Sequence, residues 1–181
     1  MENKSILILS ILGLVLLTSG CMSTTDNPES SNDSTPSSDS EVNDLESRTH
    51  SIGDTFEVDN IEYQVSDYET RDAVGDNQFN RVQADGEFII VEIDLTNTGQ
   101  ESRQITDTHL KLVDSQDRSY SVDSDTIVSV EDSLTFEQLD PGLSKSGTLV
   151  YDAPADQEGR QLEVSPAGTF STGDPHYVDL E

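Results

Sequence analysis

The chain offers few side chains that could serve as a nucleophile or as a general acid–base catalyst. Its three histidines are His50, His109 and His176, and none of them stands in a recognisable catalytic motif. Serines are abundant, but neither Gly-x-Ser-x-Gly nor Ser-x-x-Lys occurs. Carboxylates are so frequent that pairs like those of glycosidases must arise by chance. We therefore predict no catalytic residue, no cofactor and no enzymatic activity.

Calcium binding is a second kind of chemistry to consider, since hard divalent cations need clustered oxygen ligands. Asp114 and Asp117 share one expected turn, and Asp123 and Asp125 follow soon after it. Their spacing lacks the glycine and the closing glutamate of an EF-hand loop. A solvated acidic surface accounts for the same residues without a metal. We predict no metal ligands, with calcium at these turns as the alternative.

The chain has a single cysteine, Cys21, which follows Lys4, an apolar run at residues 6–17 and several small residues. The run is too short to span a bilayer, which needs about 20 residues. This arrangement resembles the lipobox of prokaryotic lipoproteins, although Thr18 stands where that family usually has an apolar residue. The resemblance implies a signal peptide at residues 1–20 and a diacylglyceryl group on Cys21, anchoring the protein to the outer face of the cytoplasmic membrane. A free thiol, or cleavage elsewhere, is the alternative.

Charge excludes several classes of partner. The chain has 37 Asp and Glu against 9 Lys and Arg, for a net charge of −28. Nucleic acids need a cationic surface, so we expect no nucleic-acid partner, and the same charge disfavours docking on anionic lipid. The acid extends along the whole chain, so it repels itself at low ionic strength and is screened at molar salt. This pattern favours a protein of an extreme halophile, with an archaeon as the expected source, and an ordinary acidic secreted domain is the alternative.

Residues 21–51 are predicted to form a disordered acidic tether, because they are mostly Ser, Thr, Asp, Asn, Glu and Pro, with little to bury. Asn32-Asp33-Ser34 matches an N-glycosylation acceptor in this exposed stretch. Such triplets also occur by chance, so use of Asn32 is left open. The folded domain is expected at residues 52–181.

The clearest element is a central strand at residues 86–99. Apolar residues alternate along it, which places them on one face of a pleated strand, and Asn97-Thr98-Gly99 ends the run with turn residues. The residues of that face are Ile89, Val91, Ile93 and Leu95.

Shorter alternating runs flank the central strand on both sides, and turn residues separate them. We expect residues 70–85 to be a long surface loop. Apolar residues alternate only weakly over residues 127–139, and we expect part of this segment to be helical. The whole pattern predicts an all-β antiparallel sandwich. The flanking runs begin near Phe56, Ile61, Leu110, Tyr120, Ser146, Leu162 and Tyr177.

Three segments, taken in order, resemble a known family. They are residues 86–99, residues 110–120 with an Asp-rich turn before a Tyr, and residues 139–154 with Asp140-Pro141-Gly142 before a strand. They resemble the immunoglobulin-like domain of unknown function on many bacterial and archaeal surface lipoproteins, which is akin to a secreted mycobacterial immunoprotective antigen. The resemblance covers about residues 51–164 and implies an immunoglobulin-like β-sandwich. Its motifs are turns and core positions, so it implies no catalytic residue.

These observations predict a non-catalytic cell-surface lipoprotein whose domain contacts another envelope protein or an extracellular ligand. The alternative is a solute- or ion-binding lipoprotein. Aromatic residues are common anchors in binding surfaces, and Tyr68, Phe79 and Tyr177 lie in or near expected loops. The alternative is that these three side chains are buried in the core. Phe79, within a polar stretch, is the best candidate for an exposed anchor.

Overall fold

The structure is a computed structural model that describes residues 47–134, 136–167 and 173–181. The predicted signal peptide, most of the predicted tether, Cys21 and Asn32 lie outside these residues. Apart from two 3-10 turns, η1 (Asp107–His109) and η2 (Ser124–Thr126), the named elements of the described part are β-strands. The all-β prediction is confirmed.

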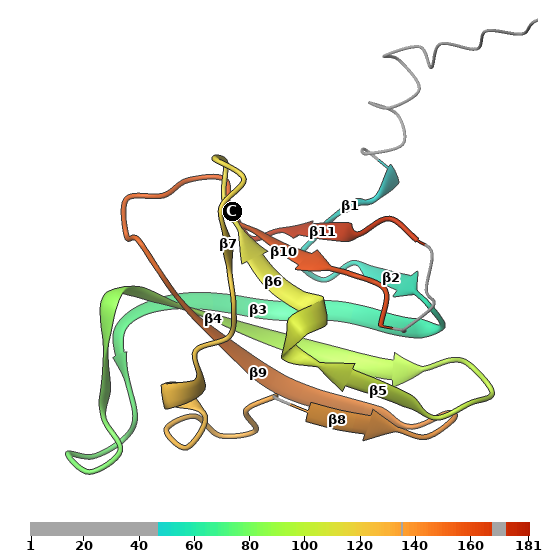
Figure 1. Cartoon of the computed structure of the whole chain (residues 1–181), viewed down its shortest axis with the longest axis horizontal. Coiled ribbons are helices and arrows are strands. Elements are labelled where there is room, and N and C mark those ends of the chain that lie inside the picture. The colour runs from blue at the N-terminus through green and yellow to red at the C-terminus, as the bar shows by residue number, and fades with distance from the viewer. Residues whose placement is uncertain (1–46, 135, 168–172) are drawn as a thin grey trace, which may run out of the picture. The chain divides into compact units, whose positions relative to one another are not determined.

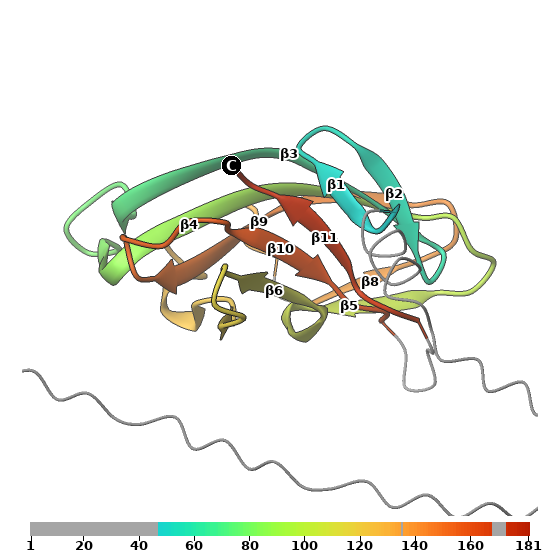
Figure 2. The ribbon, with the colours of Figure 1, turned by 90° about the horizontal axis from the view of Figure 1, so that it is seen from above.

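The strands form two larger sheets and one small sheet, and Figure 2 shows β11, β10 and β6 of one larger sheet side by side in front of β3 and β4 of the other. All strand pairs are antiparallel except β1 with β11, which run parallel. The four-stranded sheet has the order β2 (Thr55–Val58), β3 (Ile61–Val74), β4 (Val82–Asn97) and β9 (Ser144–Ala153). The five-stranded sheet has the order β1 (Thr49–Ser51), β11 (His176–Asp179), β10 (Gln161–Val164), β6 (Leu110–Val113) and β7 (Ser119–Tyr120). The small sheet pairs β5 (Arg103–Thr106) with β8 (Phe136–Leu139) (Figure 1).

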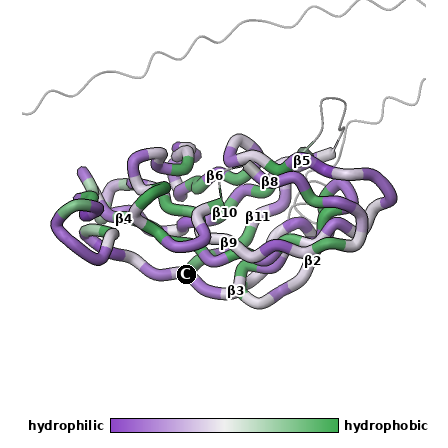
Figure 3. Tube along the Cα trace, turned by 90° about the horizontal axis from the view of Figure 1, so that it is seen from below, coloured by the Kyte–Doolittle hydropathy of each residue, from purple (hydrophilic) through white to green (hydrophobic). Residues whose placement is uncertain are grey.

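The main core lies between the two larger sheets. The alternating residues of β4 that the sequence assigned to one face are at most 1% exposed. They join one hydrophobic cluster with Leu112 of β6, Leu162 of β10 and Val178 of β11. Figure 3 shows the hydrophobic residues alternating with hydrophilic ones along the strands. Period-two patterning therefore specified which face of β4 the core would cover.

A second, smaller cluster covers part of the opposite face of the four-stranded sheet. Phe88 and Ile90 of β4 point away from the main core, and they pack with Val74 of β3 and Val150 of β9. Val130, from the segment after η2, packs against this cluster. The middle of β4, from Phe88 to Val91, is thus buried on both faces, whereas Gln83, Asp85 and Gly86 before it and Glu92 after it face solvent.

Two local predictions were wrong. The expected loop at residues 70–85 is mostly the end of β3 and the start of β4, and only residues 75–81 connect them. Most side chains of this stretch face solvent, so the sequence shows no apolar alternation there. The strands are recognised by their backbone pairing with each other, as in Val74 with Val82. The expected helical segment at residues 127–139 holds no named helix. It contains a loop after η2, followed by β8.

The folded domain begins before residue 52. β1 occupies the last three residues assigned to the tether, and its Thr49 and Ser51 pair with Tyr177 and Asp179 of β11. Three residues are too few for a period-two pattern to identify a strand. The pairing joins segments more than 120 residues apart, which a local reading of the sequence does not reveal.

Candidate functional site

The outer face of the four-stranded sheet carries an open trough, which we call the outer trough. It consists of three adjoining hollows of about 290, 320 and 190 Å³ that share Glu92 of β4. β3 forms one side of it, and residues 129–132, which follow η2, line the other. Backbone pairing ties β3, β4 and β9 together along this surface, with register shifts between β3 and β4 at Val65/Asp67 and Arg71/Ala73.

The outer trough combines an apolar floor with acidic walls. Ile90 lies in the floor, and Val74 and Val130 extend it. Among the described residues that line it, Arg71 is the one cation, and its guanidinium forms an ion pair of 2.6 Å with Glu69. The arrangement suits an extended ligand with positive charges and some apolar surface. The lining carboxylates are Asp67, Glu69, Asp76, Glu92, Asp94, Glu131 and Asp132.

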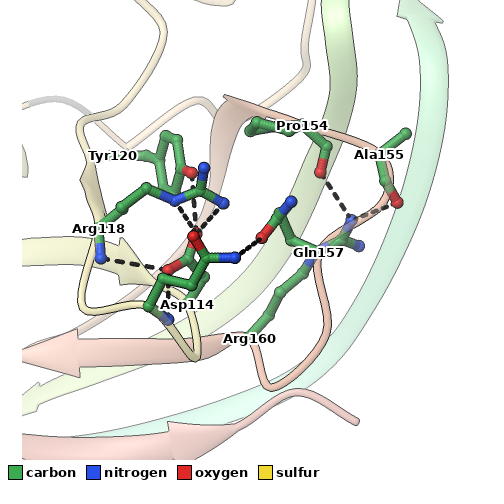
Figure 4. A network of polar contacts seen from close by, with 8 residues as sticks. Asp114, Arg118, Tyr120, Pro154, Ala155, Gln157 and Arg160 are labelled. Atoms are coloured by element: carbon green, nitrogen blue, oxygen red, sulfur yellow. Dashed lines mark hydrogen bonds and ion pairs between the residues drawn. The ribbon is translucent and has the colours of Figure 1, made fainter. Parts of the chain in front are cut away.

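The structure gives Asp114, one of the calcium candidates, a structural role (Figure 4). Its side chain is 1% exposed and accepts hydrogen bonds from the Gln116 and Arg118 backbone amides, from Arg118 Nε at 2.8 Å and from the Tyr120 hydroxyl at 2.9 Å. Burial acts to raise the pKa of this carboxyl, but these hydrogen bonds outweigh it and hold the pKa well below its usual range. Asp114 thus organises the turn between β6 and β7.

The other acidic candidates do not join Asp114 in a metal site. Asp117 has a positive φ of 57° in the same turn, and Asp123 Oδ1 accepts the Asp125 amide at 2.8 Å. Within the described ranges, no three or more His, Cys, Asp or Glu side chains are grouped so that they could hold a metal ion. These aspartates are used for backbone turns.

Arg160 supports the same corner of the sandwich. It is 5% exposed, forms an ion pair of 3.1 Å with Glu87 and donates to the carbonyl oxygens of Pro154 and Ala155. Figure 4 shows it beside the Asp114 network, to which Gln157 is joined through Gln116. A buried guanidinium with these partners fixes the chain between β9 and β10.

Two of the three histidines meet, which the sequence did not indicate. His50 Nε2 lies 2.9 Å from His176 Nδ1, and the two rings are within 5° of parallel. The His50 ring stacks on Phe56 at 4.1 Å between centroids. Partial burial lowers the pKa of both imidazoles, opposed at His50 by Asp54 and assisted at His176 by His50 and Arg48. His109 lies elsewhere, with Nδ1 at 3.0 Å from Thr106 Oγ1.

The histidine pair predicts a loss of stability in mild acid. Because the folded state lowers both pKa values, the unfolded chain binds more protons below about pH 6.5. The stability that the two neutral imidazoles contribute is therefore fully present above that pH and is lost as the pH falls below it. Both imidazoles are only partly buried, so solvent screening should keep the contribution of each below about 1 kcal/mol. The melting temperature of the wild type should fall more between pH 7 and 5 than that of His50→Gln/His176→Gln, with His109→Gln as control. Equal slopes for wild type and double variant would contradict the prediction.

The exposed aromatic that the sequence favoured is confirmed as exposed. Phe79 is 89% exposed, in the loop that joins β3 to β4. Tyr68 is partly buried against the main core, in agreement with the core-filling alternative, and Tyr177 is paired within the β1–β11 ladder. The sequence did not indicate the outer trough, because acidic residues occur along the whole chain and those of β4 do not stand out. The signal for it was Phe88 and Ile90, two apolar residues on the face of β4 that carries those acidic residues.

The fold and the outer trough define a β-sandwich domain with an open surface site. The chain belongs to the family described as Domain of unknown function (DUF4352), which matches residues 50–175. The predicted resemblance to a domain of unknown function is thereby confirmed. No curated protein matches the chain. In the part of the chain from residue 47 on that the structure describes, no helix is long and apolar enough to cross a membrane.

Several solved structures are similar to this chain. The yjhA protein from Bacillus subtilis is 22% identical, with 73% of this chain and 99% of the other covered and a TM-score of 0.58. A conserved hypothetical protein from Bacillus anthracis is 21% identical, with 71% and 94% covered and a TM-score of 0.51. The secreted protein MPT63 from Mycobacterium tuberculosis is 12% identical, with 74% and 95% covered and a TM-score of 0.49. The two Bacillus structures show that the fold is shared.

Proposed function

We propose that this protein is a non-catalytic, extracytoplasmic binding module that is attached to the membrane through a lipid on Cys21. The outer trough is the observation that carries the proposal. It presents an apolar floor around Ile90 between walls of carboxylates, on a surface fixed by strand pairing. Such a surface can hold an extended segment of another envelope protein. The lipobox-like sequence before Cys21 supports the attachment.

The proposed setting is a salt-rich exterior. At molar salt the Debye length is about 3 Å, so attraction between distant charges contributes little to affinity. Contacts at short range would then decide binding: apolar contact with Ile90 and Val130, and charges held directly against Glu69 and Glu92. The solute- or ion-binding alternative predicts a concave pocket that buries most of a small ligand. The hollows that form the outer trough are open to solvent, and they favour a macromolecular partner.

Site-specific photocrosslinking tests this function. A photoreactive residue in place of Glu131, which lies at the outer trough, is expected to give a crosslinked adduct in native membranes at molar KCl. The same residue in place of Ser119, on the edge strand β7, is the matched control and should give none. In parallel, Cys21→Ser should move the protein from the membrane to the soluble fraction. An adduct pattern at Glu131 that does not exceed that at Ser119 would contradict a binding role for the trough.

A further inference from the structure

The outer edge of β3 is open over most of its length, from Ser66 to Val74 of a strand that spans Ile61–Val74. β2 pairs with β3 only from Ile61 to Gln64, and the Gly53 amide then donates to the Val65 carbonyl at 2.8 Å. From Ser66 to Val74, the described part of the chain places no strand beside this edge. Figure 2 shows β3 continuing past β2 as the outermost strand of its sheet. Edges of this kind are templates for the pairing of another strand.

At the opposite edge of the same sheet, other segments of the chain form backbone hydrogen bonds with β9. Residues before and after the η2 loop bond to β9: the Asp123 amide donates to the Val150 carbonyl, and the Leu134 amide donates to the Thr148 carbonyl. The Thr148 amide in turn donates to the Asp132 carbonyl at 2.9 Å. The chain therefore covers the edge of β9 around Thr148 and Val150 with its own backbone, whereas the described residues leave the edge of β3 uncovered from Ser66 to Val74.

The backbone groups of the open edge point outward. The Tyr68 amide donates to the neighbouring Asp67 carboxylate at 2.9 Å, so it is directed away from β4. Because donors alternate along a strand, the Thr70 amide faces the same side. An incoming strand can accept hydrogen bonds from these amides and displace the exposed carboxylate of Asp67. Register shifts between β3 and β4 at Val65/Asp67 and Arg71/Ala73 bracket this stretch, so the regular part of the edge that an added strand can extend is short.

The side chains beside the open edge determine what such a strand must carry. On the trough side, Glu69 stands opposite Ile90 of β4, with Glu92 nearby in the same hollow. On the core side, Tyr68 stands opposite Val91 and is only partly buried. An added strand would place every second side chain beside Glu69 and the others beside Tyr68. Opposite charges and aromatic–aliphatic contacts across strands are favourable.

We propose that the β3 edge binds an extended segment of another protein in which lysine or arginine alternates with apolar residues, by adding it as a strand to the four-stranded sheet. This inference rests on the proposed function and specifies the partner's chemistry. Charge argues against two other occupants. Residues 21–46 of this chain are rich in Asp and Glu, and a second copy would bring its own Asp67, Glu69 and Asp72 against the same edge.

The test uses the full chain in molar KCl with labelled synthetic octapeptides. Lys-Thr-Lys-Val-Lys-Thr-Lys-Val is expected to bind, and the permuted peptide Lys-Lys-Lys-Lys-Thr-Thr-Val-Val controls for charge because its composition is the same. Loss of one edge hydrogen bond is worth about tenfold in affinity. Thr70→Pro removes the outward amide without removing a bond to β4, so it should weaken binding of the alternating peptide at least about tenfold, while Thr70→Val should not.

Amide hydrogen exchange in β3 gives the second readout, and protection of residues 67–74 is expected only with the alternating peptide. If Thr70→Pro alters the melting temperature, Glu69→Lys/Glu92→Lys replaces it and should reverse the preference toward a Glu-Thr-Glu-Val repeat. Equal binding of the permuted peptide, or dimerisation of the chain that Thr70→Pro abolishes, would overturn the proposal. Crosslinks at Glu131 that persist in Thr70→Pro would overturn this inference and leave the proposed function standing. If the protein without this substitution gives no crosslinks at Glu131 above those at Ser119, the proposed function itself is contradicted.

Discussion

Replacing Asn97 by alanine is expected to lower the free energy of unfolding by about 3 kcal/mol, because it leaves buried polar groups without partners. The Asn97 side chain is fully buried. Its Nδ2 donates to the carbonyl oxygens of Glu101 and Leu139, both at 2.8 Å, and its Oδ1 accepts the Gly99 amide at 2.9 Å. One amide group thus joins the end of β4, the following loop and the end of β8.

Alanine isolates the contribution of this side chain. The backbone of Asn97 also donates to the Leu143 carbonyl and accepts the Gly142 amide, and both bonds survive the substitution. Thr98→Val is the matched control, since the Thr98 hydroxyl bonds to Glu57 and Asn60 on the exposed surface, and it should cost less than about 1 kcal/mol. Denaturant unfolding at fixed salt measures both. A similar loss for the two variants would contradict the role assigned to Asn97.

Sequence patterns predicted the parts of the fold that rest on local rules. Alternation along β4 identified its core face, and Asn97-Thr98-Gly99 marked its end, although the sequence did not show that Asn97 would be buried. Asp140-Pro141-Gly142 was expected to turn, and Gly142 does adopt a positive φ of 76°, which glycine accepts without strain. These features depend on residues that are neighbours in the sequence, so local patterns are enough to predict them.

Features that depend on distant pairings were not predictable in the same way. The meeting of His50 with His176 requires β1 to lie beside β11, and β1 is only three residues long. The outer trough requires the segment after η2 to pack on β4, which brings Val130 onto Ile90. The open edge of β3 follows from a difference in strand length between β2 and β3. Each is a consequence of tertiary arrangement, which overrides local propensity.

Raising the ionic strength is expected to stabilise the folded domain, because strand pairing places like charges opposite each other. Glu57 pairs with Glu62, and Asp67 pairs with Glu92. Directly opposed like charges destabilise a sheet by roughly 0.2–1 kcal/mol per pair. The chain has 37 acidic residues against 9 basic ones, so further repulsion acts over the whole surface. Between 0.01 M and 1 M salt the Debye length falls from about 30 to about 3 Å, and the repulsion falls with it.

A KCl series on the wild type and on two variants separates this repulsion from general salt effects. The wild type should gain at least about 1 kcal/mol, or roughly 3 °C in melting temperature, from 0.01 M to 1 M KCl. Glu62→Gln removes a repelled carboxylate, so it should be more stable than the wild type at low salt and nearly equal at 1 M. Glu137→Gln removes the partner of Lys145, which lies 3.4 Å away, and should show the opposite sign at low salt. A salt response that is identical in all three proteins would mean that screening of carboxylate repulsion is not its cause.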